Sequence, residues 1–411
     1  MLFFQVKSAA EARRLLDPEP RTPGAETVAL AQAAGRIVSA DVTSPISLPE
    51  FRRAVVDGYA VQAADTFGAS PGLPAYLQLV GEVLMGQGAA TPVGAGQAVK
   101  IATGGMLPDG ADAVVMVEYT DPVGEGLVEI TRPAAPGEQL VEIGDDIQAG
   151  AVLVPRGRRL GPAEIGALAG VGILALPVYR RPRVAVVPTG DEIVAPTETP
   201  APGEVRDINT SALCAAVQLH GAEPLPYPIV RDDPGALRTI LTDALHQADL
   251  VLIAGGSSVG TRDWTLEVLL ELPGAELLLH GVSIRPGKPV IGVQLGDRLL
   301  VGLPGNPVSA LVVFDQFVRP HLRRLTGELS SLPTGSRVQA RLTRSYRSDP
   351  GKEDYVRVRV SRRADGTYDA EPLLGKSTLL RTLVEADGFL VVPEQVEGLE
   401  EGESVEVRVV D

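Results

Sequence analysis

Between residues 183 and 325, short apolar runs alternate with longer stretches of helical character. Apolar runs of four to eight residues predict buried strands, and the longer stretches predict helices. Strands that alternate with helices are typical of a mostly parallel sheet covered on both faces. The predicted strands are Val184–Val187, Glu223–Val230, Leu250–Ala254, Pro289–Val293 and Leu299–Gly302, and the predicted helices are Asn209–His220, Pro234–Gln247, Trp264–Leu270 and Val308–Leu325.

The rest of the chain shows other patterns. Helices are expected over Ser8–Leu16 and Thr27–Ser39, and a strand and a helix return at Val152–Val154 and Pro162–Gly170. Between these regions, Gly- and Pro-rich turns separate short β-type runs, which predict a small barrel or sandwich inserted into the first domain. The inserted runs are Ala75–Val83, Gln97–Ile101, Ala113–Tyr119 and Leu127–Thr131, and the C-terminal runs are Val338–Leu342, Asp354–Val360, Gly388–Val392 and Ser404–Val409.

These patterns predict a multidomain α/β plus β architecture. Residues 1–48 with 145–178 are expected to form an N-terminal mixed α/β domain, into which a β-rich domain of residues 49–144 is inserted. Residues 179–327 are expected to form a three-layer α/β domain with a mostly parallel sheet. Residues 332–411 are expected to form a small β-barrel-like module.

The composition narrows the class of protein. The net charge of −15 argues against a broad nucleic-acid-binding surface, because such surfaces are basic. No run of 18 apolar residues is present, a single cysteine excludes an intramolecular disulfide, and the N-terminus has no secretory pattern. We therefore expect a cytoplasmic protein that binds neither membrane nor nucleic acid. Lysine is rare, at five residues against 32 arginines.

Polar residues follow four of the predicted strands at the point where each strand ends. In a parallel sheet these ends meet at one edge, where ligands bind. The segment Gly302–Ser309 also begins a helix, with Asn306 suited to the N-cap and Pro307 to the first helical position. Free N–H groups at such a helix start favour an anion, most often a phosphate. The other three strand ends carry Pro188–Glu192, Arg231–Asp233 and Gly255–Asp263.

Carboxylates gather at the same strand ends, as Glu192, Asp232 and Asp263. Several carboxylates that face an anion site would repel the ligand unless a cation mediates, and Mg²⁺ bridging carboxylate and phosphate is the usual solution. Under a different interpretation, each acid is a helix N-cap or a residue of a solvated turn. The position of all three beside two glycine-rich turns favours a magnesium site.

A basic turn, Arg285-Pro-Gly-Lys288, precedes the predicted strand Pro289–Val293. Its two cations can hold a phosphate or another tetrahedral oxyanion. The alternative is an ordinary surface turn with two solvated charges. The turn lies in the sequence between Gly255–Asp263 and Gly302–Ser309, which both indicate ligand binding, and this position favours the anion site.

Two short motifs point to other functions and are rejected. Gly256–Gly260 satisfies G-x-S-x-G, the nucleophile elbow of α/β-hydrolases. A hydrolase would also need a catalytic histidine in a turn at a strand end, and neither His280 nor His321 lies in such a turn. Gly375–Thr378 resembles the end of a Walker A loop, but Ala370 replaces its first glycine and the segment lies in the β-rich module.

Taken in order, the motifs resemble those of the molybdopterin molybdenumtransferases, the MoeA-type enzymes that include the E domain of gephyrin. The similarity covers about residues 5–410. The matching α/β segments are Pro188–Glu192, Gly255–Asp263, Arg285–Pro289 and Gly302–Ala310. Nearer the N-terminus, Ala54–Ala60 is similar to S-x-M-D-G-Y-A, Ile101–Val115 to R-I-x-T-G-A followed by P-x-G-A-D-A-V-V, and Gly144–Ile147 to G-E-D-I.

The resemblance implies a homodimer whose active site lies where the α/β domain of one subunit meets the N-terminal domains of the other. The implied substrates are adenylylated molybdopterin and molybdate. Mg²⁺-dependent hydrolysis of the phosphoanhydride would release AMP and leave molybdenum on the dithiolene. A molybdopterin adenylyltransferase and molybdoenzyme maturation proteins are the implied partners.

The resemblance also implies roles for individual residues. The implied catalytic residues are Asp57, Thr103, Asp146, Glu192, Asp232 and Asp263, with the first three supplied by the partner subunit and the last two holding Mg²⁺. Those implied to bind phosphate or pterin are Gly255, Gly256, Ser258, Gly305, Asn306 and Ser309, and those implied for molybdate are Arg285, Lys288, Arg357 and Ser377. Arg285 stands where the family often has lysine, and Lys376 where it often has glycine or glutamine.

Two other functions fit part of these observations. A molybdopterin adenylyltransferase would share the α/β domain, but such enzymes resemble this chain only across residues 180–325. A receptor-clustering scaffold, the second role of the gephyrin E domain, is disfavoured because no fused adenylyltransferase domain or long linker is seen. The N-terminal domains and the C-terminal module favour molybdenum insertion.

Overall fold

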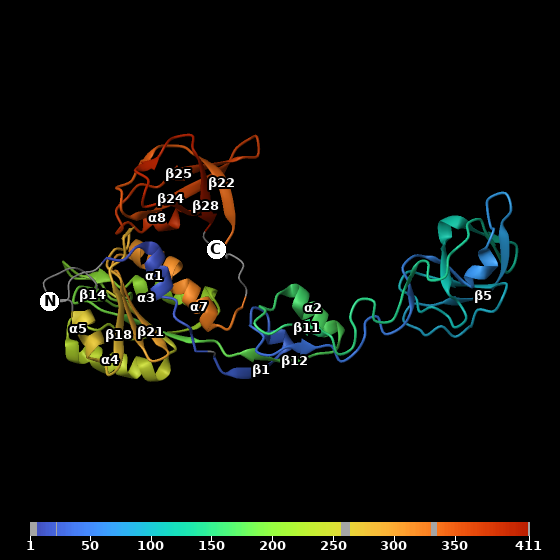
Figure 1. Cartoon of the computed structure of the whole chain (residues 1–411), viewed down its shortest axis with the longest axis horizontal. Helices are drawn as coiled ribbons and strands as arrows, with labels where there is room; N and C mark the ends of the chain where they lie inside the picture. The colour runs from blue at the N-terminus through green and yellow to red at the C-terminus, as the bar shows by residue number, and fades with distance from the viewer. Residues whose placement is uncertain (1–5, 22, 256–263, 330–334, 410–411) are drawn as a thin grey trace.

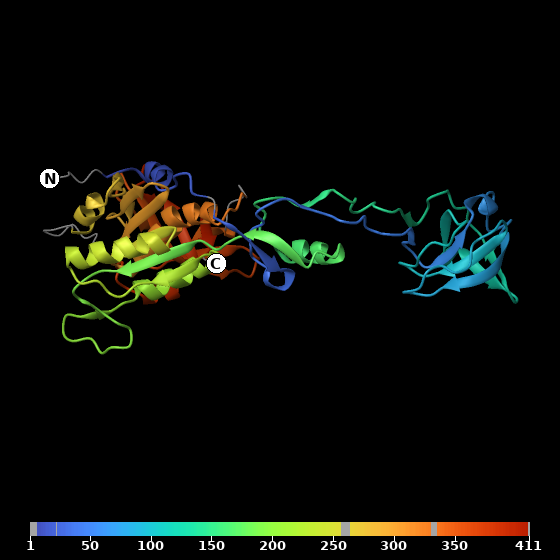
Figure 2. The same ribbon diagram turned by 90° about the horizontal axis from the view of Figure 1, so that it is seen from below.

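The chain is elongated in the computed structural model, which describes residues 6–21, 23–255, 264–329 and 335–409. A bulky body at one end carries the α/β domain with the C-terminal barrel above it, a narrow section follows, and a separate lobe lies at the far end (Figure 1). The view from below shows the same three parts in line (Figure 2). Within the described residues, no helix is long and apolar enough to cross a membrane.

The α/β domain is built on a six-stranded sheet with the order β16-β13-β17-β21-β20-β18. The first four strands in this order are parallel, whereas β20 runs antiparallel to both β21 and β18. The mostly parallel sheet predicted from sequence is therefore confirmed, with a hairpin of β20 and β21 added. The strands are β13 (Arg183–Pro188), β16 (Glu223–Pro226), β17 (Leu250–Ala254), β18 (Ala275–His280), β20 (Ile291–Leu295) and β21 (Arg298–Leu303).

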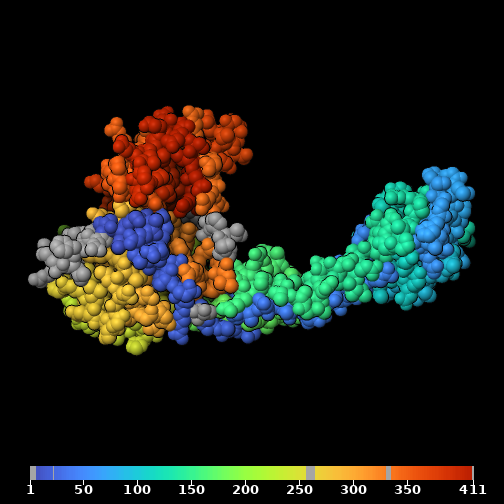
Figure 3. Space-filling view, in the orientation of Figure 1, coloured from blue at the N-terminus to red at the C-terminus, as the bar shows by residue number. Residues whose placement is uncertain are grey.

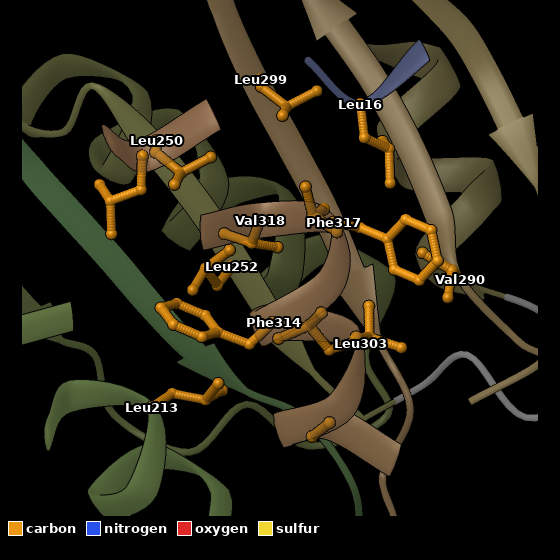
Figure 4. Packing of buried hydrophobic residues seen from close by; sticks show 14 of the residues in the cluster. Leu16, Leu213, Leu250, Leu252, Val290, Leu299, Leu303, Phe314, Phe317 and Val318 are labelled. Carbon is orange, nitrogen blue, oxygen red and sulfur yellow. The ribbon is translucent and has the colours of Figure 1, made fainter. Parts of the chain in front are cut away.

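Helices cover both faces of this sheet. Successive strand residues point to opposite faces, so Val186 packs in one apolar cluster and Val187 in the other. Figure 4 shows the first cluster, in which Phe317 lies close to Leu16, and Phe314 lies close to Leu252 of β17. The helices are α1 (Ala9–Leu15), α3 (Asn209–Leu219), α4 (Pro234–Gln247), α5 (Trp264–Glu271), α6 (Pro307–Val313), a π-helical turn (Phe314–Val318) and α7 (Arg319–Leu325).

The narrow section corrects one prediction. The helix expected over Thr27–Ser39 is wrong, because residues 25–29 form a strand that pairs with β12 and is followed only by a 3₁₀ turn at Leu30–Gln32. Cross-strand pairing and two β-branched residues, Thr27 and Val28, override the alanine-rich composition. The elements here are β1 (Ala25–Ala29), β2 (Val42–Thr43), β11 (Val152–Val154), α2 (Pro162–Gly170) and β12 (Ala175–Tyr179).

The far lobe is a six-stranded sheet with the order β7-β4-β6-β5-β9-β8. Two separate apolar clusters are buried within it. The chain enters and leaves through a short antiparallel pair, β3 with β10. The strands are β3 (Arg53–Ala54), β4 (Gly58–Val61), β5 (Ala75–Val83), β6 (Gln97–Ile101), β7 (Ala113–Met116), β8 (Thr120–Val123), β9 (Leu127–Ile130) and β10 (Leu140–Val141).

The C-terminal module is a closed five-stranded barrel, because β26 pairs with both β28 and β24. One short strand of the α/β domain, β19 (Ile284–Arg285), extends this sheet by pairing in parallel with β24. The barrel is thereby joined to the segment that carries the basic turn. Its elements are β22 (Arg337–Leu342), β23 (Tyr346–Arg347), β24 (Glu353–Arg362), β25 (Tyr368–Pro372), α8 (Arg381–Val384), β26 (Gly388–Val392), β27 (Gly398–Leu399) and β28 (Ser404–Val409).

Candidate functional site

A pocket of about 840 Å³ lies between the α/β domain and the barrel, and we call it the basic pocket. Among the described residues that line it, none is an aspartate or glutamate. Three of the five lysines of the chain lie there, although the protein as a whole is strongly acidic. Such a concentration of positive charge is suited to an anionic ligand. The cationic lining residues are Arg285, Lys288, Arg347, Lys352, Arg357 and Lys376.

Because β20 runs antiparallel to β21, the basic turn that precedes β20 lies at the edge of the sheet where the parallel strands end. In the antiparallel pair of β20 and β21, Ile291 at the start of β20 lies opposite Gly302 near the end of β21. The residues before β20 therefore meet the turn that follows β21. Gly287 has a φ of +113°, and a Cβ there would lie 2.8 Å from the Val313 side chain, so only glycine lets the turn lie this close to α6.

Arg357 is a buried cation on β24, with 6% of its surface exposed. Its Nη2 donates to the carbonyl of Gly375 at 3.0 Å, and Nη1 donates to the hydroxyl of Thr382. Within the described part of the chain, no carboxylate forms an ion pair with Arg357, and its Nε has no hydrogen-bond partner. Burial lowers the pKa of Arg357. A bound anion would compensate this charge.

Arg285 is held differently, because it is tied to the barrel. Its guanidinium pairs with the fully buried carboxylate of Asp354 and, at 3.1 Å, with Asp349. It also donates to the hydroxyl of Tyr346 at 3.2 Å. Burial alone would lower the pKa of Arg285, but Asp354 and Tyr346 raise it. Arg285 therefore links two domains as well as lining the basic pocket.

A second cavity of about 670 Å³, which we call the central pocket, adjoins the basic pocket. The two share Pro289, Asn306 and Thr378. Glu192, Gly255, Gly305 and Asn306 all line the central pocket, so the structure brings these four predicted residues together. Ser309, which the resemblance grouped with them, is buried and lines the basic pocket, together with Ser377 and Lys288.

Two buried residues control the shape of the central pocket. Gly255 has a φ of +118°, and a Cβ there would lie 2.2 Å from the carbonyl oxygen of Thr189, so the strand ends of β13 and β17 approach only because of this glycine. Asn209, at the start of α3, donates from Nδ2 to the carbonyl of Gly305 at 2.8 Å. Among the described residues, its buried Oδ1 has no hydrogen-bond partner.

Asn306 occupies the predicted N-cap position of α6 with Pro307 at the first helical position, but its side chain does not cap the helix. Its Nδ2 instead donates to the hydroxyl of Ser377 at 3.1 Å. The N–H of Val308 donates to the carbonyl of Ser377 at 3.4 Å. A loop of the barrel therefore occupies part of the helix start.

The acidic group, which we define as Asp191, Glu192 and Asp232, lies beside the central pocket. The backbone N–H of Asp232 donates to the Asp191 side chain at 3.1 Å. Burial, together with the charges of Asp191 and Glu192, raises the pKa of Asp232. Among the residues that the structure describes, no three His, Cys, Asp or Glu side chains are grouped to hold a metal ion. Gly256, Ser258 and Asp263 lie outside the described residues.

Asp57, Thr103 and Asp146 lie away from both pockets in the same chain. The Asp57 carboxylate accepts hydrogen bonds from the N–H and the hydroxyl of Thr103, at 2.7 and 2.9 Å, and these bonds lower the pKa of Asp57. Asp146 is exposed and its N–H donates to the carbonyl of Leu48 at 3.1 Å. The space-filling view shows the narrow section that separates the far lobe from the body (Figure 3).

Several polar lining residues were missed by sequence reasoning, among them four that carry a charge or, within the described residues, an unpaired buried group suited to a ligand. Arg347, Lys352 and Lys376 line the basic pocket, and Asn209 lines the central pocket. The rarity of lysine could have drawn attention to Lys352 and Lys376, because lysines that recur within one region of an otherwise acidic chain indicate an anion-binding site. No comparable signal marks Arg347 or Asn209.

Three family models match successive parts of the chain. The MoeA N-terminal region (domain I and II) matches residues 7–172, the probable molybdopterin binding domain matches 185–324, and the MoeA C-terminal region (domain IV) matches 339–410.

Relatives match nearly the whole chain. The molybdopterin molybdenumtransferase of Bacillus subtilis is 32% identical over 389 residues, which cover 94% of this chain and 90% of that protein. The corresponding Nostoc protein is 36% identical over 373 residues, covering 90% and 85%. A crystal structure of the molybdopterin biosynthesis MoeA protein of Pyrococcus horikoshii has a TM-score of 0.84 at 30% identity, covering 99% of this chain and 100% of that one. The chain therefore belongs to the MoeA family of molybdopterin molybdenumtransferases.

Proposed function

We propose that this protein acts in molybdenum cofactor biosynthesis by inserting molybdenum from molybdate into adenylylated molybdopterin and releasing AMP. The observation that carries the proposal is the basic pocket, in which six cations and no described carboxylate face one cavity. That cavity adjoins a central pocket lined by the glycine-rich strand ends. An oxyanion site beside a phosphate site matches the two anionic substrates.

The proposed chemistry divides between the two pockets. In the basic pocket, Lys288 and Arg357 hold molybdate by charge-assisted hydrogen bonds, and Arg285 lines the same wall while it anchors the barrel. The two dithiolene thiols replace one oxygen ligand of molybdate, which leaves as water with their protons. In the central pocket, water cleaves the phosphoanhydride bond, so that AMP departs and a phosphate remains on molybdopterin. The polar groups of Asn209 and Asn306 orient the phosphates there.

Magnesium fits the acidic group beside the central pocket. Two carboxylates together with substrate phosphates are a common Mg²⁺ ligand set, so a group of three protein ligands is not required. Asp191, Glu192 and Asp232 crowd negative charge into one place, which a cation would relieve. We propose that Asp232 and Asp263 hold Mg²⁺, which would neutralise the phosphoanhydride oxygens and the departing AMP.

We also propose that the site is completed by a second copy of the chain. Asp57 and Thr103 form a polar pair in the far lobe, where one chain cannot bring them to its own pockets. A homodimer would supply this pair and Asp146 in trans. A molybdopterin adenylyltransferase and molybdoenzyme maturation proteins, as supplier and acceptor of the cofactor, remain the partners that we propose.

The test is incubation of the full chain with adenylylated molybdopterin, Mg²⁺ and molybdate, followed by chromatography for AMP and metal analysis of the pterin product. AMP release that requires Mg²⁺ and yields molybdenum-loaded pterin is the expected result. Absence of AMP would contradict the proposal. Consumption of ATP with unmodified molybdopterin, with release of pyrophosphate, would indicate adenylylation instead.

A further inference from the structure

A segment near the N-terminus, residues 7–16, contacts two walls of the basic pocket, and we call it the N-terminal strap. One of these walls is residues 284–289, which include the basic turn, and the other belongs to β24 of the barrel. The strap contains α1, which lies between the barrel and the rest of the α/β domain (Figure 1, Figure 3). Among the described residues that line the basic pocket, none belongs to the strap, so any effect of the strap on a ligand must pass through these walls.

The first contact is made by the backbone, on the side of the basic turn. The N–H of Lys7 donates to the carbonyl of Gly281 at 3.0 Å, and the N–H of Ser283 donates to the carbonyl of Lys7 at 2.8 Å. The carbonyl of Ser283 in turn accepts a hydrogen bond from the N–H of Glu353 at 3.0 Å. Since β19 follows Ser283 directly and carries Arg285, the strap and β24 hold the start of this wall from two sides.

The second contact is made by a side chain, that of Arg13 on α1. Its guanidinium pairs with the Glu353 carboxylate and donates to the Tyr355 hydroxyl at 2.5 Å. The Tyr355 hydroxyl also donates to Glu353, so the three polar groups are bonded to one another. The guanidinium carbon lies 5.7 Å from the centre of the Phe317 ring, which restricts the arginine further. Arg13 therefore joins α1 to the first half of β24.

Strand β24 connects this contact to the basic pocket. Glu353, Tyr355 and Arg357 are alternate residues of the strand, so their side chains lie on the same face. Tyr355 is 3% exposed, packs in the apolar cluster that contains Phe317, and lines the basic pocket. Arg357, the buried cation that we assign to molybdate, is the next residue on that face. A shift of Glu353 and Tyr355 would therefore displace Arg357.

We infer that Arg13 is a positioning residue for molybdate binding. By holding Glu353 and Tyr355, it keeps Arg357 at its distance from the basic turn on the opposite wall. This inference rests on the proposed function, because it takes the oxyanion to bind in the basic pocket. Charge-assisted hydrogen bonds depend on distance and direction, so a pocket whose walls can separate binds a small tetrahedral anion less tightly.

The experiment measures molybdate binding to the full chain by calorimetry, and AMP release from adenylylated molybdopterin at a series of molybdate concentrations. Arg13→Met removes the guanidinium and keeps an unbranched apolar side chain beside Phe317. Arg14→Met, at an exposed position of the same helix, is the matched control. Circular dichroism checks folding, and Glu353→Gln is the second variant if Arg13→Met fails to fold.

Arg13→Met, or Glu353→Gln in its place, should weaken molybdate binding about tenfold, which corresponds to the loss of one hydrogen bond to a charged group. The rate of AMP release at saturating molybdate and the KM for adenylylated molybdopterin should stay unchanged, and Arg14→Met should behave as the wild type. An unchanged molybdate affinity, a loss confined to the rate at saturating molybdate, or an equal loss in Arg14→Met would each overturn the inference. The proposed function fails by a different result, namely that the wild type releases no AMP.

Discussion

Asn306 and Ser377 join two domains through one hydrogen bond, with 3.1 Å between the amide nitrogen and the hydroxyl oxygen. Asn306 belongs to the strand-to-helix turn of the α/β domain, and Ser377 to a loop of the barrel. Both residues line the basic pocket, and Asn306 lines the central pocket as well. The wall between the two pockets is therefore built from both domains, and docking of the barrel defines it.

Ser377→Ala should weaken molybdate use without unfolding the protein. Loss of one hydrogen bond of this kind costs about 0.5–1.5 kcal/mol, which corresponds to about two- to tenfold in affinity. The molybdate concentration for half-maximal AMP release should rise by that factor. Ser361→Ala, exposed on β24, is the control. An unchanged molybdate dependence in Ser377→Ala would contradict the assignment.

Arg357→Met should impair function more than stability. The methionine removes a buried charge that has no carboxylate partner among the described residues, but it also removes the hydrogen bonds to Gly375 and Thr382, so the free energy of unfolding should change by less than about 1 kcal/mol. The same change should lower molybdate affinity by more than about tenfold. Thermal unfolding with and without molybdate measures both effects, since a bound ligand raises the transition temperature. A variant that molybdate still stabilises as strongly as the wild type would refute this role for Arg357.

Asp354→Asn and Asp349→Asn remove different partners of Arg285. Asp354 is fully buried, so its loss should lower stability by about 3 kcal/mol. Asp349 is exposed, so solvent screens its charge and its loss should change stability far less. Denaturant unfolding of both variants against the wild type is the measurement. Equal effects would show that Arg285 is not anchored through the barrel interior.

Two inactive variants should restore activity when mixed, if the far lobe completes the site of a partner. Asp57→Asn alters the lobe, and Lys288→Ala alters the basic pocket. After unfolding and refolding together, about a quarter of wild-type AMP release is expected, because half of the dimers are mixed and each mixed dimer has one intact site. A mixture no more active than its separate components would argue that the lobe does not act in trans.

Glu328→Gln should lower stability in a pH-dependent way. Burial alone would raise the pKa of Glu328, but ion pairs with Arg323 and Arg159 lower it below its ordinary value of 4.5. A carboxylate with a depressed pKa stabilises the fold above its unfolded pKa, and this contribution is lost as pH falls through the folded value.

The variant should therefore be less stable by about 2 kcal/mol at pH 7, with a difference that shrinks as the pH falls below 4.5. Thermal unfolding at pH 7 and at about pH 3.5 measures this change. Glu276→Gln, exposed on β18, is the control. A difference that stays constant with pH would contradict the assigned shift.

Sequence reasoning located most of the α/β elements because their apolar runs are compact and well bounded. Leu250–Ala254 and Pro234–Gln247 agree residue for residue with the structure. It failed for Thr27–Ser39, where pairing with a strand about 150 residues away decides the conformation. It also missed β18, whose partner is the antiparallel strand β20.

The candidate site was only partly accessible from sequence. Motif order placed Glu192 and Gly305 at one sheet edge, because parallel strands end there. The basic turn reaches the same edge for a different reason, since it precedes an antiparallel strand. Motif order carries no distances, so the expectation that Asp57 acts on the partner's site came from the family resemblance and not from the order of the motifs. The pairing of Arg285 with Asp354 depends on two segments that meet only in the folded state.

Because lysine is scarce in this chain, chemical modification of its lysines can report whether a ligand occupies the basic pocket. Only five side-chain amines are present, and Lys288, Lys352 and Lys376 share one cavity, while Lys7 and Lys100 lie elsewhere in ion pairs with glutamates. Treatment with an acylating reagent, followed by mass spectrometry, would show how many amines of the basic pocket a bound ligand protects. Lys7 and Lys100 would serve as the two internal references. Occupancy could be followed in the unlabelled, unmutated chain, since arginine, which supplies most of the positive charge, does not react.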